Sequence, residues 1–258
     1  MGAVIILISG SIRGLVASGL FARQAETFHQ AFVETSAARG FIVKNIMVEG
    51  RINLSRTGLK TLLNIDKNDP LYDQDLNELQ AKIQSLTWVK AAIVERRLPD
   101  TLYIKIVERE PIALWQRART LAVVDDEGIV LTDYNIQKFK KLLVVVGDNA
   151  PQNTRALLSV LDEVPTIKAR VDAAKWIGER RWDLTLSNKI IIRLPSENAA
   201  AALKKLETLH ANDLVLDRPL TAIDLRDTNR IIVQTTPGDV DKIDSSFIQN
   251  APQKDKDI

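Results

Sequence analysis

The stretch ERRLPDTLYIKIVEREP, residues 95–111, alternates between apolar and polar side chains with the period of a β-strand. Leu102, Ile104 and Ile106 fall on one face of this strand, and the residues between them fall on the other. Leu98-Pro99-Asp100, just before the strand, has the composition of a turn. Residues 88–96 form the expected first arm, with one face made by Val89, Ala91 and Ile93. The stretch therefore predicts a β-hairpin.

The chain before this hairpin supplies the rest of a small domain. Residues 41–48 alternate as a strand, and Ser55 stands where a helix N-cap belongs. Asp73 or Asp75 can cap a second helix, whose apolar face would consist of Leu76, Leu79, Ile83 and Leu86. We expect a domain at residues 41–110 with the order strand, helix, helix, strand, strand, in which both helices cover one face of the sheet.

After Pro111 the pattern changes to many short strands, interrupted by a helix around residues 154–163. A second helix, capped by Ser196, would bury Ala199, Leu203, Leu206 and Leu209. Residues 221–226 and 230–235 form the last predicted hairpin. The fold class is therefore α+β, with a larger mixed β domain and two flanking helices at residues 111–236. Residues 237–258 are mostly polar and are expected to form a disordered tail.

The first residues of the chain are apolar but interrupted. Residues 3–8 and 15–21 are largely apolar, with Arg13 between them. A membrane span needs roughly 20 apolar residues, and a signal peptide would need a basic segment before the apolar run. We expect residues 1–24 to form part of a transmembrane helix and residues 25–40 a stalk. A buried soluble helix is the alternative.

Composition and motifs argue against catalysis. The 258-residue chain has a formal net charge of +2 and no cysteine, which excludes disulfides and thiolate sites. His29 and His210 are far apart in sequence, and Asp125 and Asp126 form a turn rather than a cation site. Phosphate loops and nucleophile elbows do not occur. We therefore expect no enzyme activity, no metal and no cofactor. The dispersed charge argues against nucleic acid, and tryptophans in alternating strands indicate core packing rather than base stacking.

Several motifs occur together in a fixed order. The segment SLTWVKAAIVERRLPDTLYIKIVEREPIALW is preceded by IMVEG and followed by ERRWDLTLSN and IDLRDTNRIIV. In this combination the chain resembles the FtsQ/DivIB family of bacterial cell-division proteins over roughly residues 41–234. The resemblance implies that residues 41–110 form a polypeptide-transport-associated (POTRA) domain.

The resemblance also implies a location and partners. Family members are single-pass proteins of the inner membrane, with the bulk of the chain in the periplasm at the division septum. They act as divisome scaffolds that bind the small bitopic proteins FtsB and FtsL, and other divisome proteins through the POTRA domain. A different hypothesis is a POTRA-type chaperone module of a protein-translocation or outer-membrane assembly machine.

Partner-binding residues follow from the matched motifs. Arg180, Arg181 and Trp182 match the family's Arg-Arg-Trp stretch. The family's partner-binding strand corresponds to Arg230, Ile231, Ile232, Val233, Gln234 and Thr235. Asp227 and Thr235 stand where some relatives have aromatic residues, so the mode of binding carries over better than individual contacts.

The residues themselves favour the same strand. Its sequence, RIIVQT, lacks the proline and most of the charge that usually protect an edge strand from pairing. The alternative is that its apolar residues are core and fully paired within the sheet. Asp224 and Arg226 should project opposite Ile223 and Leu225 and orient this end of the domain. A solvated ion pair worth little is the alternative for them.

Overall fold

The computed structural model describes residues 20–227 and 229–235, and it divides between Arg109 and Glu110 into two compact units. Most of the expected membrane segment and the expected disordered tail lie outside the described residues. Within the described part of the chain, no helix has the length and apolar character needed to cross a bilayer.

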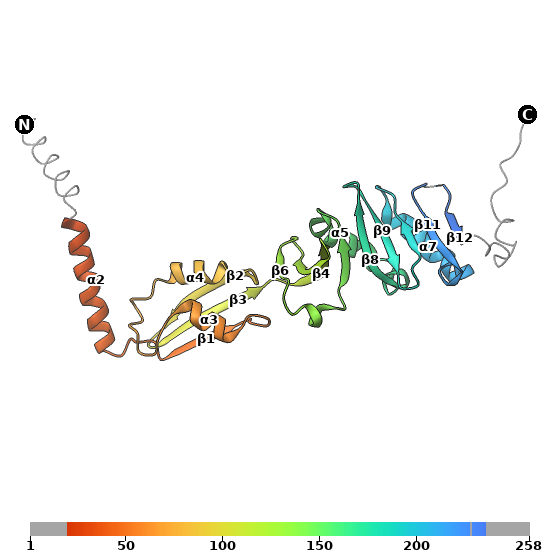
Figure 1. Cartoon of the computed structure of the whole chain (residues 1–258). Coiled ribbons are helices and arrows are strands. Elements are labelled where there is room, and N and C mark those ends of the chain that lie inside the picture. The colour runs from red at the N-terminus through yellow and green to blue at the C-terminus, as the bar shows by residue number, and fades with distance from the viewer. Residues whose placement is uncertain (1–19, 228, 236–258) are drawn as a thin grey trace, which may run out of the picture. The chain divides into compact units, whose positions relative to one another are not determined.

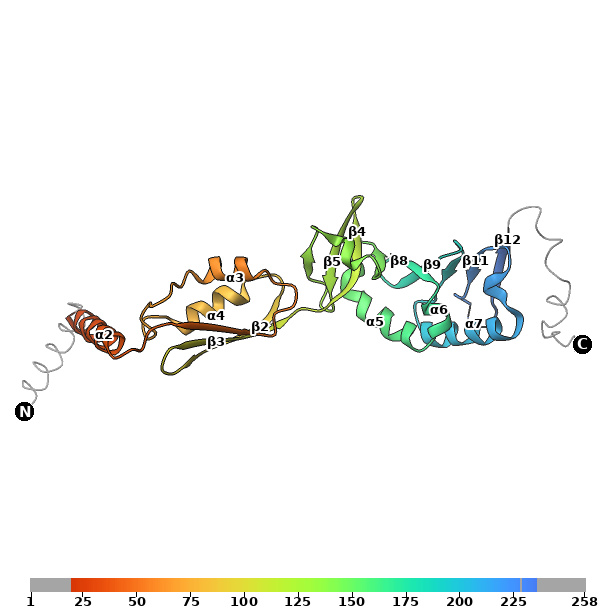
Figure 2. The same cartoon turned by 90° about the horizontal axis from the view of Figure 1, so that it is seen from below.

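The first unit contains α2 (Leu20–Ala38), β1 (Asn45–Glu49), α3 (Arg56–Leu63), α4 (Leu76–Gln84), β2 (Val89–Arg97) and β3 (Thr101–Glu108). The sheet order is β1-β3-β2, with β1 parallel and β2 antiparallel to β3. Figure 2 shows α3 and α4 together on one face of this sheet. The predicted order of strand, helix, helix, strand, strand is confirmed.

Local sequence signals determine where the helices of this unit begin. The Ser55 side chain accepts a hydrogen bond from the Gly58 N–H and caps α3, while Asp75 caps α4 by accepting from two backbone N–H groups. The predicted inner face of β3 is also confirmed, since Leu102, Ile104 and Ile106 are all buried beneath the helices. These residues form the core of the unit.

The predicted alternation of β2 is wrong. The buried side chains of this strand are Val89, Ala92 and Val94, whereas Ile93 is 51% exposed. The pairing of β2 with β3 shifts register between Val89 and Ala91, which marks a β-bulge at Lys90. One extra residue reverses which side chains face the core.

Two contacts hold the segment after β1 against β3. Gly50, in the IMVEG motif, has a φ of +84°, and a Cβ at this position would lie 2.0 Å from the carbonyl oxygen of Ile106. The Glu108 carboxylate then accepts hydrogen bonds from the backbone N–H groups of Ile52, Asn53 and Leu54 at 2.7 to 2.9 Å. These bonds satisfy three donors that no strand or helix pairs.

Helix α2, which includes much of the expected stalk, packs through its C-terminal half against the loop that carries Tyr72. The Phe32 ring meets Tyr72 edge-on, with centroids 5.1 Å apart, and Val33 is buried. Arg96 of β2 donates to the carbonyl oxygens of Leu71 and Gln74, which fixes the loop that carries Tyr72. Phe28, one turn earlier on α2, is 71% exposed.

The second unit begins with β4 (Pro111–Arg117), β5 (Thr120–Asp125), β6 (Val130–Thr132), a 3₁₀ turn η1 (Ile136–Phe139) and β7 (Leu143–Val146). Helices α5 (Ala150–Asp162) and α6 (Pro165–Lys168) precede β8 (Val171–Ile177), β9 (Arg181–Leu186) and β10 (Ile191–Arg193). The described chain ends with α7 (Ala199–Asp213), η2 (Val215–Asp217), β11 (Leu220–Asp224) and β12 (Ile232–Thr235).

These strands form one nine-stranded sheet of order β12-β11-β10-β9-β8-β7-β4-β5-β6. Figure 2 shows α5, α6 and α7 along one face of it, and Figure 1 shows β12 at the end of the row of strands. The core lies between the sheet and these helices, around fully buried side chains such as Leu161, Leu184, Ile192 and Leu203. The overall α+β class is confirmed.

The expected cap of the last helix is wrong. Helix α7 begins at Ala199, and its N-cap is Asn198, with a φ of 56° and no side-chain cap hydrogen bond. Ser196 lies in the loop between β10 and α7. This loop lines three adjoining hollows, so its conformation matters for the site described below.

The hydrogen bonds from the N–H groups of Ile52, Asn53 and Leu54 to the Glu108 carboxylate predict that the first unit loses stability at acid pH. Burial alone would raise the pKa of Glu108, but the N–H groups of Leu54, Asn53 and Ile52 together lower it below its usual range. A lowered pKa in the folded state stabilises the unit above the unfolded pKa, and this stabilisation is lost as the pH falls through the folded pKa. Glu108→Gln should therefore accelerate amide exchange at Leu102 and Ile104, and should do so more at pH 7 than at pH 4.

The matched control is Glu78→Gln, which removes only an exposed ion pair with Lys82. Exchange is compared after correction for the intrinsic rate at each pH. If the two variants accelerated exchange equally at pH 7, the hydrogen bonds to Glu108 would contribute no more to stability than an exposed ion pair does.

Candidate functional site

Strand β12 is one edge of the large sheet. It pairs antiparallel with β11, aligning Ile232 with Asp224, Val233 with Ile223 and Gln234 with Ala222. Among the described residues no strand pairs with its other side. An edge strand of this kind presents backbone donors and acceptors to whatever approaches it.

Two hydrogen bonds show which backbone groups of β12 point outward. The Thr221 hydroxyl donates to the Gln234 carbonyl at 3.2 Å, so the backbone groups of Gln234 face β11. On the other side of β11, the Leu225 N–H donates to the Arg193 carbonyl at 2.9 Å, which turns the backbone of Asp224 toward Ile232. Because these directions alternate along a strand, the N–H groups of Val233 and Thr235 face outward.

The side chains of this segment divide between the core and the surface. Ile231 and Val233 pack against the core, whereas Ile232 is 47% exposed and Gln234 is exposed. The side chains of Ile231 and Val233 are therefore part of the core, as the alternative interpretation expected, whereas that of Ile232 is not. The other expectation, an unpaired outer backbone edge, agrees with the pairing of the described strands.

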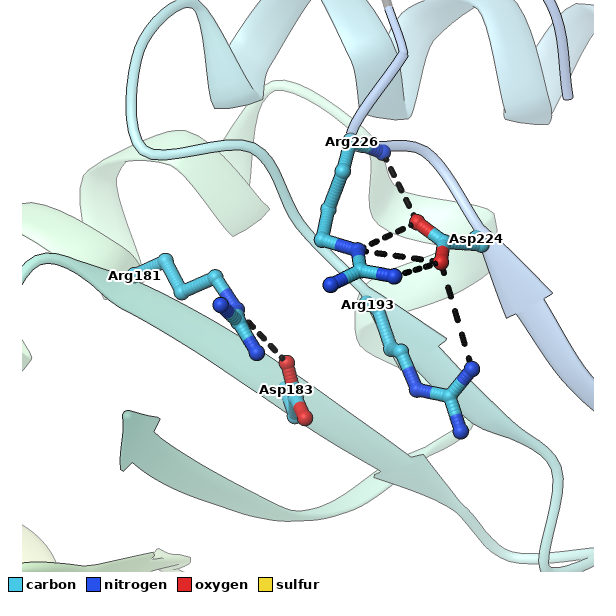
Figure 3. A network of polar contacts seen from close by, with 5 residues as sticks. All are labelled: Arg181, Asp183, Arg193, Asp224 and Arg226. Carbon is cyan, nitrogen blue, oxygen red and sulfur yellow. Dashed lines mark hydrogen bonds and ion pairs between the residues drawn. The ribbon is translucent and has the colours of Figure 1, made fainter. Parts of the chain in front are cut away.

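Asp224, the register partner of Ile232, is the centre of a charged network (Figure 3). Its carboxylate accepts hydrogen bonds from the Arg226 side chain at 2.5 to 3.0 Å and from the Arg226 backbone N–H at 3.0 Å. Arg193 approaches Oδ2 of Asp224 from β10 at 3.9 Å. Asp224 is only 7% exposed, so the alternative of a solvated pair is wrong for this residue.

The charges of this network change the ionisation of Asp224. The Arg226 guanidinium lowers the pKa of the Asp224 carboxyl, against the opposing effect of burial, and the Arg226 N–H and the charge of Arg193 lower it further. The same contacts raise the pKa of Arg226. Both groups therefore stay charged over the physiological range, and the network ties the end of β11 to β10.

Arg181 and Trp182 lie at the start of β9, and Arg180 lies just before them. Arg181 forms an ion pair with Asp183 at 3.5 Å, as Figure 3 shows. Arg180, Arg181 and Arg226 line a common hollow of about 500 Å³ together with the loop at residues 195–198. The structure thus brings three of the predicted arginines, Arg180, Arg181 and Arg226, to one site, while Trp182 is 7% exposed and belongs mainly to the core.

Arg230 lies at the other end of the same region. It forms an exposed ion pair with Asp227 at 2.9 Å, and both residues line a further hollow of about 210 Å³ with Ile231. The pKa of Asp227 is lowered by the Asn229 N–H and by Arg230. This loop leads directly into β12.

Sequence reasoning missed Arg193, Asp183 and the loop at residues 195–198. Arg193 reaches Asp224 because β10 and β11 are parallel neighbours that align these two residues. Asp183 is in turn the antiparallel partner of Arg193. An alternating pattern predicts on which face of the sheet a side chain lies, but it does not predict which strands become neighbours. The sequence therefore carries no signal for these contacts.

Other candidate residues do not assemble into a site. His29 is exposed on α2, while His210 is buried in the second unit. Within residues 20–227 and 229–235, no group of three acidic or histidine side chains is placed to hold a metal ion. The Asp125 and Asp126 turn joins β5 to β6 as expected.

The Asp224 network predicts a measurable loss of stability in Asp224→Asn. The substitution leaves Arg226 and Arg193 without a carboxylate, and should lower the free energy of unfolding by about 1–2 kcal/mol at pH 7. Because the pKa of Asp224 is lowered in the folded state, this difference should be complete above the unfolded pKa of about 3.9 and should shrink as the pH falls from there through the folded pKa. Denaturant unfolding of both proteins at several pH values measures it.

Asp172→Asn is the control, since Asp172 forms an exposed surface pair with Lys189 at 3.8 Å in the same unit. If Asp224→Asn lowered the free energy of unfolding no more than Asp172→Asn does, the network would not contribute to stability.

Comparison with known proteins agrees with this architecture. Residues 41–109 match the POTRA domain, FtsQ-type, and residues 113–226 match the cell division protein FtsQ/DivIB, C-terminal. "Cell division protein FtsQ" of Rickettsia felis is 36% identical over 78% of this chain and 75% of its own length. The protein of the same name from Bradyrhizobium diazoefficiens is 30% identical over 90% of this chain and 68% of its own length. The chain therefore belongs to the FtsQ/DivIB family of cell division proteins.

Proposed function

We propose that the protein is a non-catalytic scaffold of the bacterial divisome, which binds FtsB- and FtsL-like small bitopic proteins outside the inner membrane. The observation that carries this proposal is the outer edge of β12. Its outward N–H groups at Val233 and Thr235 can pair with an extended segment of a partner, as in other cases of β-strand addition.

The surroundings of β12 suit a fixed partner rather than a transient one. Asp224 is held by two arginines and aligns with Ile232, so the edge is presented by a rigid neighbouring strand. Arg180 lines the same hollow as Arg226 and Arg181, which already pair with Asp224 and Asp183, so Arg180 is the arginine there that can select a partner with an acidic residue. Backbone pairing would provide affinity, and this side chain would provide specificity.

The remaining parts of the proposal concern location. A transmembrane helix within residues 1–24 would anchor the chain in the inner membrane as a single-pass protein. The rest would lie in the periplasm at the division septum. The POTRA domain at residues 41–110 would contact other divisome proteins, while the domain at residues 111–236 would bind the small bitopic pair.

Proline substitutions test the docking edge directly. Val233→Pro removes an outward N–H and should weaken binding of the FtsB- and FtsL-like pair at least tenfold, while lowering the unfolding temperature about as much as Val233→Ala, which loses the same core packing. Ile232→Pro removes an N–H that faces β11, and should lower the unfolding temperature of the second unit. Calorimetric titration and thermal unfolding of each variant measure the two effects.

Val233→Ala controls for the side chain, since it trims the same packing but keeps the N–H. Normal binding by a folded Val233→Pro protein would show that β12 is not the docking edge. A chaperone module would instead bind many unrelated extended peptides weakly, and a pulldown from cells with the outer region as bait would reveal this.

A further inference from the structure

A small pocket adjoins the arginine-lined hollow. It lies between α5 and the start of α7 and has a volume of about 160 Å³. Its walls include Leu157 and Val160 of α5, Trp176 of β8 and Leu194 after β10. A cavity of about 150 Å³ with apolar walls is large enough to hold a benzene ring. The pocket therefore has room for one bulky apolar side chain.

Most of the polar side chains of the pocket can only donate hydrogen bonds, and the exception is Ser196. Nε1 of Trp176 is buried and makes no hydrogen bond within the described residues, although buried donors are normally satisfied. Trp176 packs against Trp182 with centroids 4.9 Å apart, which fixes the direction of its indole. Arg180 and Arg181 are also in the lining, which contains no acidic residue. The pocket thus favours an occupant with an acceptor or a negative charge beside its apolar group.

The pocket adjoins further hollows along the loop at residues 195–198. It shares Arg180, Arg181, Pro195 and Ser196 with the 500 Å³ hollow. That hollow shares Pro195, Glu197 and Asn198 with the hollow of about 210 Å³ that reaches Ile231, next to β12. The same loop therefore lines the pocket beside the tryptophan pair and the hollow beside the start of β12.

We infer that this pocket is an anchor site for the same partner that pairs with β12. The occupant is a leucine-sized to phenylalanine-sized side chain, adjacent in the partner to an acidic residue that faces Arg180. This inference rests on the proposed function and adds a second point of attachment to it. Well-packed pockets of this kind usually carry a large share of binding energy in protein interfaces.

Filling the pocket tests the inference without removing any core atom. Ala156 is an exposed residue of α5 that lines the pocket, so Ala156→Leu should occupy it and leave thermal unfolding unchanged. Binding of the soluble FtsB- and FtsL-like pair from the same organism should weaken at least tenfold. Ala211→Leu, at an exposed position of α7 outside all the hollows, is the matched control and should bind normally.

A second measurement uses the indole N–H signal of Trp176 in nitrogen-proton correlation spectra. The signal should shift when the pair is added to the wild-type protein and should stay in place with Ala156→Leu. Binding by Ala156→Leu within twofold of wild type, or an unmoved Trp176 signal, would overturn the inference.

Val233→Pro separates this inference from the proposed function. If Val233→Pro abolishes binding while Ala156→Leu does not, the docking edge stands and the anchor pocket fails. If Val233→Pro binds normally, the proposed function itself fails.

Discussion

Antiparallel pairing of β12 with β11 satisfies only half of the backbone hydrogen-bonding groups of β12. The inward half, at Ile232 and Gln234, ties the strand to its own sheet, while the outward half faces away from it. Ile231 and Val233 keep the strand in place by packing against the core, without covering the outer edge. A strand can thus be firmly attached and still able to accept another strand.

The charged network makes this edge stable. Asp224 lies on β11 beside Ile232, and its carboxylate is held by Arg226 from the same segment and Arg193 from β10. The charges therefore link two neighbouring strands, β10 and the end of β11, rather than forming an isolated surface pair. Such partly buried, hydrogen-bonded pairs resist separation more than exposed ones do. The loop at residues 195–198 then lines hollows that contain Arg180, Arg181 and the two tryptophans on one side and Ile231 on the other.

Local patterns in the sequence predict much of this fold. Alternation in residues 101–108 gives the buried face of β3, and Ser55 and Asp75 are recognisable helix caps. The bulge at Lys90 is not predictable in this way, because one inserted residue reverses the alternation without any composition signal. Asn198, rather than Ser196, caps α7 through its backbone conformation alone. The contact of Arg193 with Asp224 depends on which strands become neighbours, and alternation says nothing about that.

The proposed docking edge lies just beyond residue 226, where the match to the family's C-terminal domain ends, so its role needs a test on the backbone of β12 itself. Residue-resolved amide exchange of β12, with and without the FtsB- and FtsL-like pair, does this most directly. In the free protein, Ile232 and Gln234 should be protected while Val233 and Thr235 exchange rapidly, and the partner should slow only the second pair. Unchanged exchange at Val233 and Thr235 in the bound state would contradict the account.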